Sequence, residues 1–362
     1  MVTRASPKRG LPAFTDRRAH SLKERRKPLP WPKDKPFKIL SLDGGGIRGI
    51  YAATILAQIE REITGGEPIA DYFDTIAGTS TGGIIALGLG LKKSASKIEK
   101  LYVEDGHLVF PERWRKRPLR RWWQQLRGSL LDHTELERLL YDTFQDETVG
   151  DSSARLVIPA FLSPKTQIAV LKTDHHEDFK KDYLMAAWEA ARATSAAPTF
   201  FQGHTASDDH VFLDGGVWAN NPIMAAIVDA LSAYDVAREQ IQIFSIGTGN
   251  APYDIGAFAL RGGLFQWREI IKGAIFLTTD NAQAQACLLL GPENILRLEP
   301  KRGAAEIDLD DWRGAVTVLP AQARADYEAN RDRIASLFVD KVAPRHRFYT
   351  SGNTAENEPL RR

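Results

Sequence analysis

The chain has 362 residues, of which 43% are hydrophobic and 26% charged, and its formal net charge at pH 7 is +2. These values are typical of a globular protein with a substantial core, and they exclude a fibrous or wholly disordered chain. Cys287 is the only cysteine, so no intramolecular disulfide can form and we expect a reducing, cytoplasmic setting. We expect neither a signal peptide nor a membrane span, because no long uninterrupted apolar run is present.

Positive charge is concentrated at the start of the chain. Residues 1–38 contain twelve Lys/Arg against three Asp/Glu. This composition predicts a flexible basic arm over residues 1–36. Such an arm could touch anionic lipid headgroups or nucleic acid, or could simply be solvated. No motif in it indicates specific recognition of DNA or RNA.

The first predicted elements are a buried strand at residues 37–42 and a helix at residues 50–63, and they are joined by Asp43-Gly-Gly-Gly-Ile-Arg-Gly49. Three glycines between a strand and a helix form a nest of N–H groups suited to an anion. The loop lacks the Gly-Lys-Ser/Thr of a phosphate-binding loop and the spacing of a dinucleotide fingerprint. Arg48 adds a positive charge that could orient the loop, meet a substrate phosphate, or form a surface ion pair.

The next predicted strand ends in Gly78-Thr-Ser-Thr-Gly82, and a helix follows. This is the layout of a nucleophile elbow, in which Ser80 stands on a tight strand-to-helix turn. The small residues Gly78 and Gly82 let the backbone turn and let a substrate approach. The alternative is a glycine-rich turn that merely packs a helix on a sheet.

A Trp/Arg-rich insertion at residues 111–127 precedes a predicted helix at residues 131–140. Tryptophan and arginine together suit a membrane interface, and they also suit stacking on a nucleobase beside a phosphate. The tryptophans could equally be core anchors. The insertion is therefore a candidate lid or ligand surface, with candidate residues Arg115, Arg117, Arg121, Trp122 and Trp123.

The sequence contains a candidate for the base that Ser80 would need, the carboxylate of Asp214. Strands are predicted at residues 155–162 and 166–172, a helix at residues 183–193, and a short strand that stops at Asp214-Gly215-Gly216. None of the eight histidines stands in a strand-end context of the kind a catalytic histidine occupies. A Ser–Asp dyad removes the need for one, provided that desolvation raises the pKa of the Asp. The alternative role of Asp214 is to cap a turn.

The rest of the chain contains a strand at residues 241–246 and then mainly helices, at residues 264–277, 281–290 and 319–339. The alternation of strands and helices predicts a mostly parallel sheet with helices on both faces. We therefore expect a catalytic domain at residues 37–250, a mainly helical part at residues 251–350, and a frayed tail at residues 351–362.

The glycine loop, the Gly-x-Ser-x-Gly motif and the Asp-Gly-Gly motif, in this order, resemble the signature blocks of patatin-like phospholipases. Residues 193–201, Ala-Thr-Ser-Ala-Ala-Pro-Thr-Phe-Phe, resemble a fourth block. The resemblance implies a three-layer α/β/α sandwich and hydrolysis of acyl-lipid esters. It also implies that Ser80 is the nucleophile, that Asp214 is its partner, and that the Gly44, Gly45 and Gly46 backbone, with Arg48 nearby, is the oxyanion hole.

Residues 39–60 further resemble the CapV-type subgroup, the patatin-like effectors of cyclic-oligonucleotide antiphage signalling. That subgroup implies activation by a cyclic dinucleotide and degradation of the phospholipid of the cell's own membrane, at its inner face. A homo-oligomer is left open, and no metal is expected. The competing hypotheses are a constitutive lipase or esterase on other acyl esters, and a non-catalytic sensor in which the glycine nest binds an anion.

Overall fold

The computed structural model describes residues 26–111, 131–163, 166–198, 200–249, 267–301 and 307–349. A central eight-stranded sheet runs through these residues in the order β5-β6-β3-β2-β1-β7-β8, with β4 also paired to β3. The strands are β1 (Phe37–Leu42), β2 (Thr75–Gly78), β3 (Arg155–Ser163), β4 (Gln167–Lys172), β5 (His204–Thr205), β6 (Val211–Asp214), β7 (Ile241–Ile246) and β8 (Ile295–Leu298).

The sheet has a parallel part and an antiparallel part. Parallel pairing joins β3 to β2, β2 to β1, β1 to β7 and β7 to β8. Antiparallel pairing joins β4 and β6 to β3, and β5 to β6. The carboxyl ends of the five parallel strands therefore lie at one edge, which is where sheets of this kind hold their ligands.

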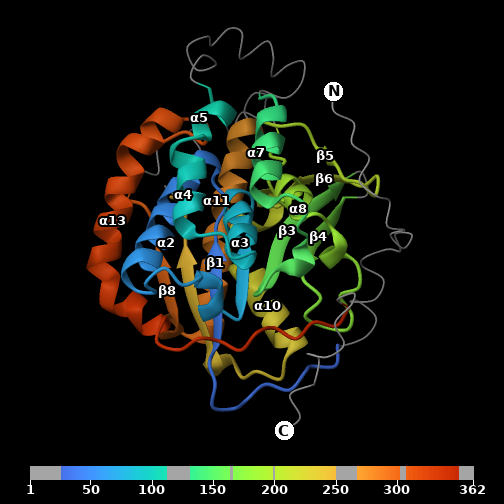
Figure 1. Ribbon diagram of the computed structural model, residues 1–362, viewed down its shortest axis with the longest axis vertical. Coiled ribbons are helices and arrows are strands. Elements are labelled where there is room, and N and C mark those ends of the chain that lie inside the picture. Colours follow the sequence, from blue (N-terminus) through green and yellow to red (C-terminus); the bar gives the residue numbers. More distant parts are fainter. Residues whose placement is uncertain are drawn as a thin grey trace.

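Helices cover both faces of the sheet, as Figure 1 shows. Along β1, Leu40 and Leu42 join a core on one face, whereas Phe37 and Ile39 join a second core on the other. The first core includes α2, which packs between α4 and α13, and the second includes α10, which packs on α11. The described helices are α2 (Ile50–Glu62), α3 (Thr81–Gly90), α4 (Ala95–Val103), α5 (Gly106–Val109), α7 (Thr134–Phe144), α8 (Ala187–Thr194), α9 (Gly216–Ala219), α10 (Ile223–Ala233), α11 (Trp267–Leu290) and α13 (Trp312–Leu337).

The α/β class with a mostly parallel sheet and a helical C-terminal part is confirmed, and this C-terminal part differs from the prediction in three elements. Residues 295–298 form β8, a strand that the sequence analysis did not identify. One continuous helix, α11, replaces the two helices predicted at residues 264–290. Helix α13 begins at Trp312 instead of residue 319, because Asp311 accepts a hydrogen bond from the Gly314 N–H and so caps an earlier start. Pro320 lies inside this helix and does not begin it.

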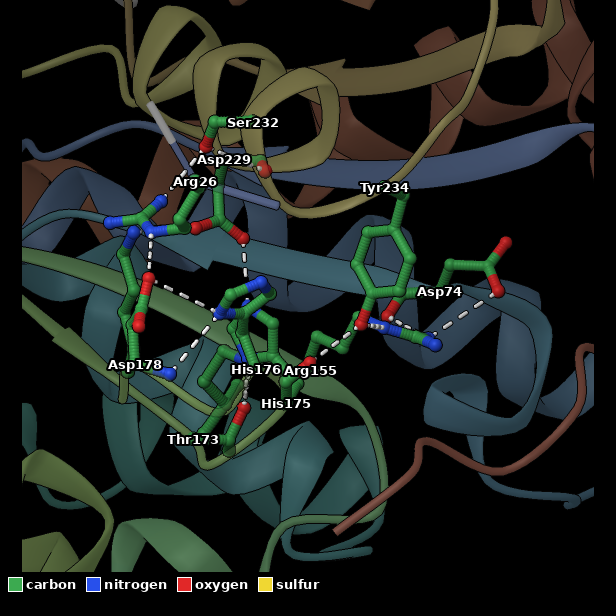
Figure 2. A network of polar contacts seen from close by, with 12 residues as sticks. Arg26, Asp74, Arg155, Thr173, His175, His176, Asp178, Asp229, Ser232 and Tyr234 are labelled. Carbon is green, nitrogen blue, oxygen red and sulfur yellow. Dashed lines mark hydrogen bonds and ion pairs between the residues drawn. The ribbon is translucent and has the colours of Figure 1, made fainter. Parts of the chain in front are cut away.

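Residues 26–36 lie against the edge at which the parallel strands begin. Leu29 pairs with Tyr234 in a parallel bridge, and the Arg155 guanidinium lies over the rings of Trp31, Phe37 and Tyr234. Figure 2 shows Arg26 between Ser232 and Asp178. Its Nη1 donates to the Ser232 hydroxyl at 2.9 Å, and its Nε lies 3.4 Å from Asp178 Oδ2. The described end of the expected basic arm is thus attached to the body of the protein by stacking, charge and backbone pairing.

Parts of three sequence-based predictions lie outside the described residues. These are the arm at residues 1–25, the Trp/Arg-rich insertion from residue 112 onward, and the tail at residues 351–362. Within the described ranges, no helix is both long and apolar enough to cross a membrane.

Candidate active site

Ser80 lies at a sharp turn between β2, which ends at Gly78, and α3, which begins at Thr81. Its backbone has φ 55° and ψ −122°, a combination that a residue with a side chain adopts only at a cost of about 1–3 kcal/mol. Strain of this kind is typical of a nucleophile elbow, because it lifts the serine oxygen away from the sheet. The turn has the geometry predicted from the Gly-x-Ser-x-Gly motif.

The two glycines of the motif are required by close backbone contacts. A Cβ placed on Gly78 would lie 2.1 Å from the carbonyl oxygen of Gly82, and a Cβ on Gly82 would lie 2.2 Å from that of Leu42. Real Cβ atoms do not approach backbone oxygens this closely. The absence of side chains therefore allows the turn to fold against the end of β1, which carries the glycine loop.

The Ser80 hydroxyl donates a hydrogen bond to Asp214 Oδ2 at 2.7 Å. The other carboxylate oxygen accepts the Gly216 N–H at 2.6 Å, so both oxygens of Asp214 are fixed. Burial raises the pKa of Asp214 to about 6, and the hydrogen bonds from Ser80 and Gly216 and the charge of Arg192 oppose this rise. A hydroxyl bonded to a buried carboxylate of raised pKa can lose its proton to that carboxylate during reaction.

The long strand β3 brings these two side chains together. Residues Arg155–Val157 of β3 pair with β2, and residues 160–163 pair with β6. Strand β4 pairs with one side of β3, from residue 157 to 162. Strands β2 and β6 therefore both pair with the other side of β3, where they lie end to end. Asp214, at the end of β6, therefore faces the turn that follows β2.

Thr194 supports the serine from the C-terminal end of α8. Its hydroxyl oxygen accepts the Ser80 N–H at 3.0 Å and donates to the Pro159 carbonyl at 2.6 Å. The Thr194 carbonyl also accepts the Gly215 N–H at 3.3 Å. This single residue therefore connects the elbow, the centre of β3 and the turn that carries Asp214.

The glycine loop lies directly against the serine, since a Cβ on Gly44 would be 3.2 Å from Ser80 Cβ. The Gly44 N–H donates to the Asn220 carbonyl at 2.9 Å. Within the part of the chain that the structure describes, the N–H groups of Gly45 and Gly46 have no such acceptor. Of the three glycines proposed for anion binding, Gly45 and Gly46 therefore have backbone donors that no described residue accepts.

Arg48 orients the loop. Its Nη1 donates to the Gly249 carbonyl at 3.0 Å, in the turn that follows β7. Burial lowers the pKa of Arg48 to about 10, which still leaves the guanidinium charged at neutral pH. From the same turn, the Thr248 hydroxyl donates to the Gly44 carbonyl at 2.6 Å.

Several residues at the site had no assigned role in the sequence analysis. Thr194 stands inside the quoted block at residues 193–201, Asn220 lies four residues after the Asp-Gly-Gly motif, and Thr248 lies two residues after the strand predicted at residues 241–246, so a local signal was present for each. Arg297 and Glu299 follow no motif. Arg297 reaches Asp43 at the start of the glycine loop, and Glu299 reaches the turn after β7, only because β8 joins the sheet beside β7. Among the described residues, no cluster of His, Cys, Asp and Glu could hold a metal ion.

Comparison with known proteins places this chain in a family. The family model for patatin-like phospholipase matches residues 40–227, more than half of the chain. The chain belongs to the patatin-like phospholipase family. It is thus a carboxylic-ester hydrolase of lipids, as the sequence predicted.

Three similar relatives of this patatin-like phospholipase are bacterial proteins named "cGAMP-activated phospholipase". The Escherichia coli protein is 37% identical over 86% of this chain and 95% of its own length. The Vibrio cholerae protein is 36% identical over 76% of this chain and 85% of its own length. The Pseudomonas aeruginosa protein is 35% identical over 69% of this chain and 75% of its own length.

Proposed function

We propose that the protein is a phospholipase A that uses Ser80 and Asp214 as a catalytic dyad. The observation that carries this proposal is the 2.7 Å hydrogen bond from the Ser80 hydroxyl to a buried carboxylate, at a strained turn beside the glycine loop. Asp214 takes the hydroxyl proton as the Ser80 oxygen attacks the carbonyl carbon of an acyl ester. Its raised pKa makes it a stronger base than an exposed carboxylate.

The N–H groups of Gly45 and Gly46 then stabilise the negative oxygen of the tetrahedral intermediate. Collapse of the intermediate breaks the ester C–O bond, and the proton held by Asp214 passes to the departing alcohol oxygen of the lysophospholipid. The acyl group remains on Ser80. Water attacks this acyl-enzyme by the same route, with Asp214 again as the base, and releases a fatty acid.

We further propose that a cyclic dinucleotide activates hydrolysis, and that the enzyme is an antiphage effector acting at the inner face of the membrane. The names and the extent of three bacterial relatives support the activator. Unregulated lipolysis would damage the host, so a resting state of low activity is required. The activator shifts this state only by binding the active arrangement more tightly.

Fatty-acid release from phospholipid vesicles tests both parts. The wild-type protein and Ser80→Ala are compared with and without cGAMP. Release that needs both Ser80 and cGAMP supports the full proposal. Equal release without any nucleotide removes the regulatory part, and equal release by Ser80→Ala removes the dyad.

A further inference from the structure

The glycine loop begins at Asp43, whose side chain is held by residues of β7 and β8 and of the turns that follow them. We call this group the strand-end clamp: Asp43, Ser245, Gly249, Arg297 and Glu299. Arg297 is its centre. Its Nη1 and Nη2 donate to the two carboxylate oxygens of Asp43 at 3.0 and 2.6 Å, and Nη1 also donates to the Ser245 hydroxyl at 2.7 Å. Two-pronged pairing of this kind fixes the direction of a carboxylate as well as its position.

Glu299 extends the clamp to the turn after β7. One of its carboxylate oxygens lies 2.5 Å from Arg297 Nη2, and the other accepts the Gly249 N–H at 2.9 Å. The carbonyl of Gly249 accepts the Arg48 side chain. These contacts form a continuous series that begins and ends in the glycine loop. Asp43 pairs with Arg297 and Arg297 with Glu299. Glu299 bonds Gly249, which in turn bonds Arg48.

The electrostatics of the clamp give Arg297 a role that neutral side chains could not fill. Asp43 is 3% exposed, and its burial raises its pKa, an effect that the adjacent guanidinium opposes. Burial lowers the pKa of Arg297, but the two carboxylates outweigh this effect and raise it, so the guanidinium is charged at neutral pH. Without the guanidinium, Asp43 would be left buried without a cationic partner, and its geometry would no longer be fixed.

Asp43 is covalently followed by Gly44, which lies against Ser80, and then by Gly45 and Gly46. Its own N–H donates to the Ile246 carbonyl at 3.1 Å, which continues the β1–β7 ladder to the start of the loop. Farther along, the Ile47 N–H donates to the Leu309 carbonyl at 3.0 Å. Residues beyond 227, where the family-model match ends, therefore hold the loop at its start and near its end.

We infer that Arg297 is a positioning residue for hydrolysis, which holds the Gly45 and Gly46 N–H groups in place through Asp43. This inference rests on the proposed function. Donors of this kind must lie within a few tenths of an ångström of the developing oxyanion, and loss of one such donor costs about 10²–10³-fold in turnover. A displaced loop therefore lowers kcat, because the donors act on the transition state and much less on the bound ester.

The test compares Arg297→Lys with Arg345→Lys. Arg345 is a matched control, since it forms a buried pair with Asp174 at 2.5 Å but is bonded to residues at the opposite edge of the sheet. Both variants keep a positive charge and lose guanidinium hydrogen bonds: Arg297→Lys loses the two-pronged pairing with Asp43, and Arg345→Lys loses the fork that also reaches the Ser152 and Gly150 carbonyls. Turnover of a soluble short-chain ester is measured per folded molecule, in the presence of cGAMP, with amide hydrogen exchange of residues 43–49 measured in parallel.

We expect Arg297→Lys to lower kcat about 10–100-fold with little change in KM, and to speed exchange in residues 43–49. Arg345→Lys should leave both unchanged relative to wild type. Equal kcat in the two variants would overturn the inference, as would unchanged exchange at the loop in Arg297→Lys. If wild type and Ser80→Ala hydrolyse the ester equally, the proposed function fails, and the exchange data still decide whether Arg297 fixes the loop.

Discussion

Two hydroxyl–carboxylate arrangements lie at opposite edges of the sheet. At the carboxyl ends of the parallel strands, Ser80 donates directly to Asp214. At the other edge, Figure 2 shows Thr173, His175 and Asp229 in line, with Thr173 Oγ1 2.7 Å from His175 Nδ1 and His175 Nε2 2.8 Å from Asp229 Oδ2. By residue type and order, the second arrangement is closer to a hydroxyl–imidazole–carboxylate triad.

The two arrangements differ in burial and in the charges that surround the carboxylate. Thr173 and His175 are completely buried, so no substrate can reach them, whereas Ser80 is partly exposed. Asp229 also pairs with Lys172 Nζ at 2.5 Å, which holds the pKa of Asp229 well below its usual range. From the described residues, Asp214 accepts hydrogen bonds only from the Ser80 hydroxyl and the Gly216 N–H, and its pKa is raised to about 6. A buried carboxylate with a bonded cation stabilises the fold, and one without it is available as a base.

The largest expected effect comes from Ser80→Ala, with Thr173→Ala as its matched control. Removing the nucleophile should lower turnover by at least about 10⁴-fold with the fold intact. Thr173→Ala should leave turnover per folded molecule unchanged and cost about 1–3 kcal/mol of stability, because it removes the hydroxyl bonded to His175 and to the Leu156 N–H. Vesicle assays measure turnover, and urea unfolding measures stability. Loss of turnover in both variants would contradict the comparison.

Asp214→Asn should lower turnover about 10³-fold while raising stability at pH 8. The folded-state pKa of about 6 lies above the usual 3.8, so folding favours the protonated form. Ionisation of Asp214 therefore destabilises the folded state. This loss of stability is absent below pH 4, grows between pH 4 and pH 6, and is complete above pH 6. Removing the charge should therefore gain about 1–3 kcal/mol at pH 8 and almost nothing at pH 4. Thermal unfolding at the two pH values checks this; an equal gain at both would contradict it.

Asp229→Asn should have the opposite effect on stability. The pKa of Asp229 is lowered by Lys172 and His175, so its stabilising contribution is present at neutral pH and is lost as the pH falls through the folded-state pKa. The change should cost about 3 kcal/mol at pH 7, because Lys172 loses its counterion. Urea unfolding at pH 7 measures the loss. Turnover per folded molecule should be unchanged, and a fall comparable to that of Asp214→Asn would disprove the structural role.

The smallest of these effects is expected from Thr194→Val, which removes the acceptor of the Ser80 N–H and leaves that donor without its hydrogen bond. We expect a loss of about 1–2 kcal/mol of stability and about a tenfold fall in kcat. Thr205→Val is a control, since Thr205 is exposed in the short strand β5. Indistinguishable kcat values for the two variants would show that Thr194 is not needed for the turn.

The sequence predicted the local turns better than the long-range geometry. Ser80, Asp214 and the three glycines stand at strand ends that short motifs mark, so their approximate places followed from local patterns. Arg297 could not be found this way, since an arginine in a four-residue strand carries no motif and its partner is 254 positions away. Nor could the sequence indicate that the Gly44 N–H is already bonded to Asn220, because that depends on how two loops meet.

The end-to-end arrangement of β2 and β6 on β3 has a consequence for how this enzyme can vary. The distance between the hydroxyl and its carboxylate depends on the register of β3, on the close contacts of Gly78 and Gly82, and on Thr194. The connection between β4 and α8, residues 173–186, holds none of these contacts, so it can lengthen or change without moving either group. New regulatory sequence could therefore be inserted there while the chemistry is preserved, whereas a one-residue slip of β3 would turn both partners away together.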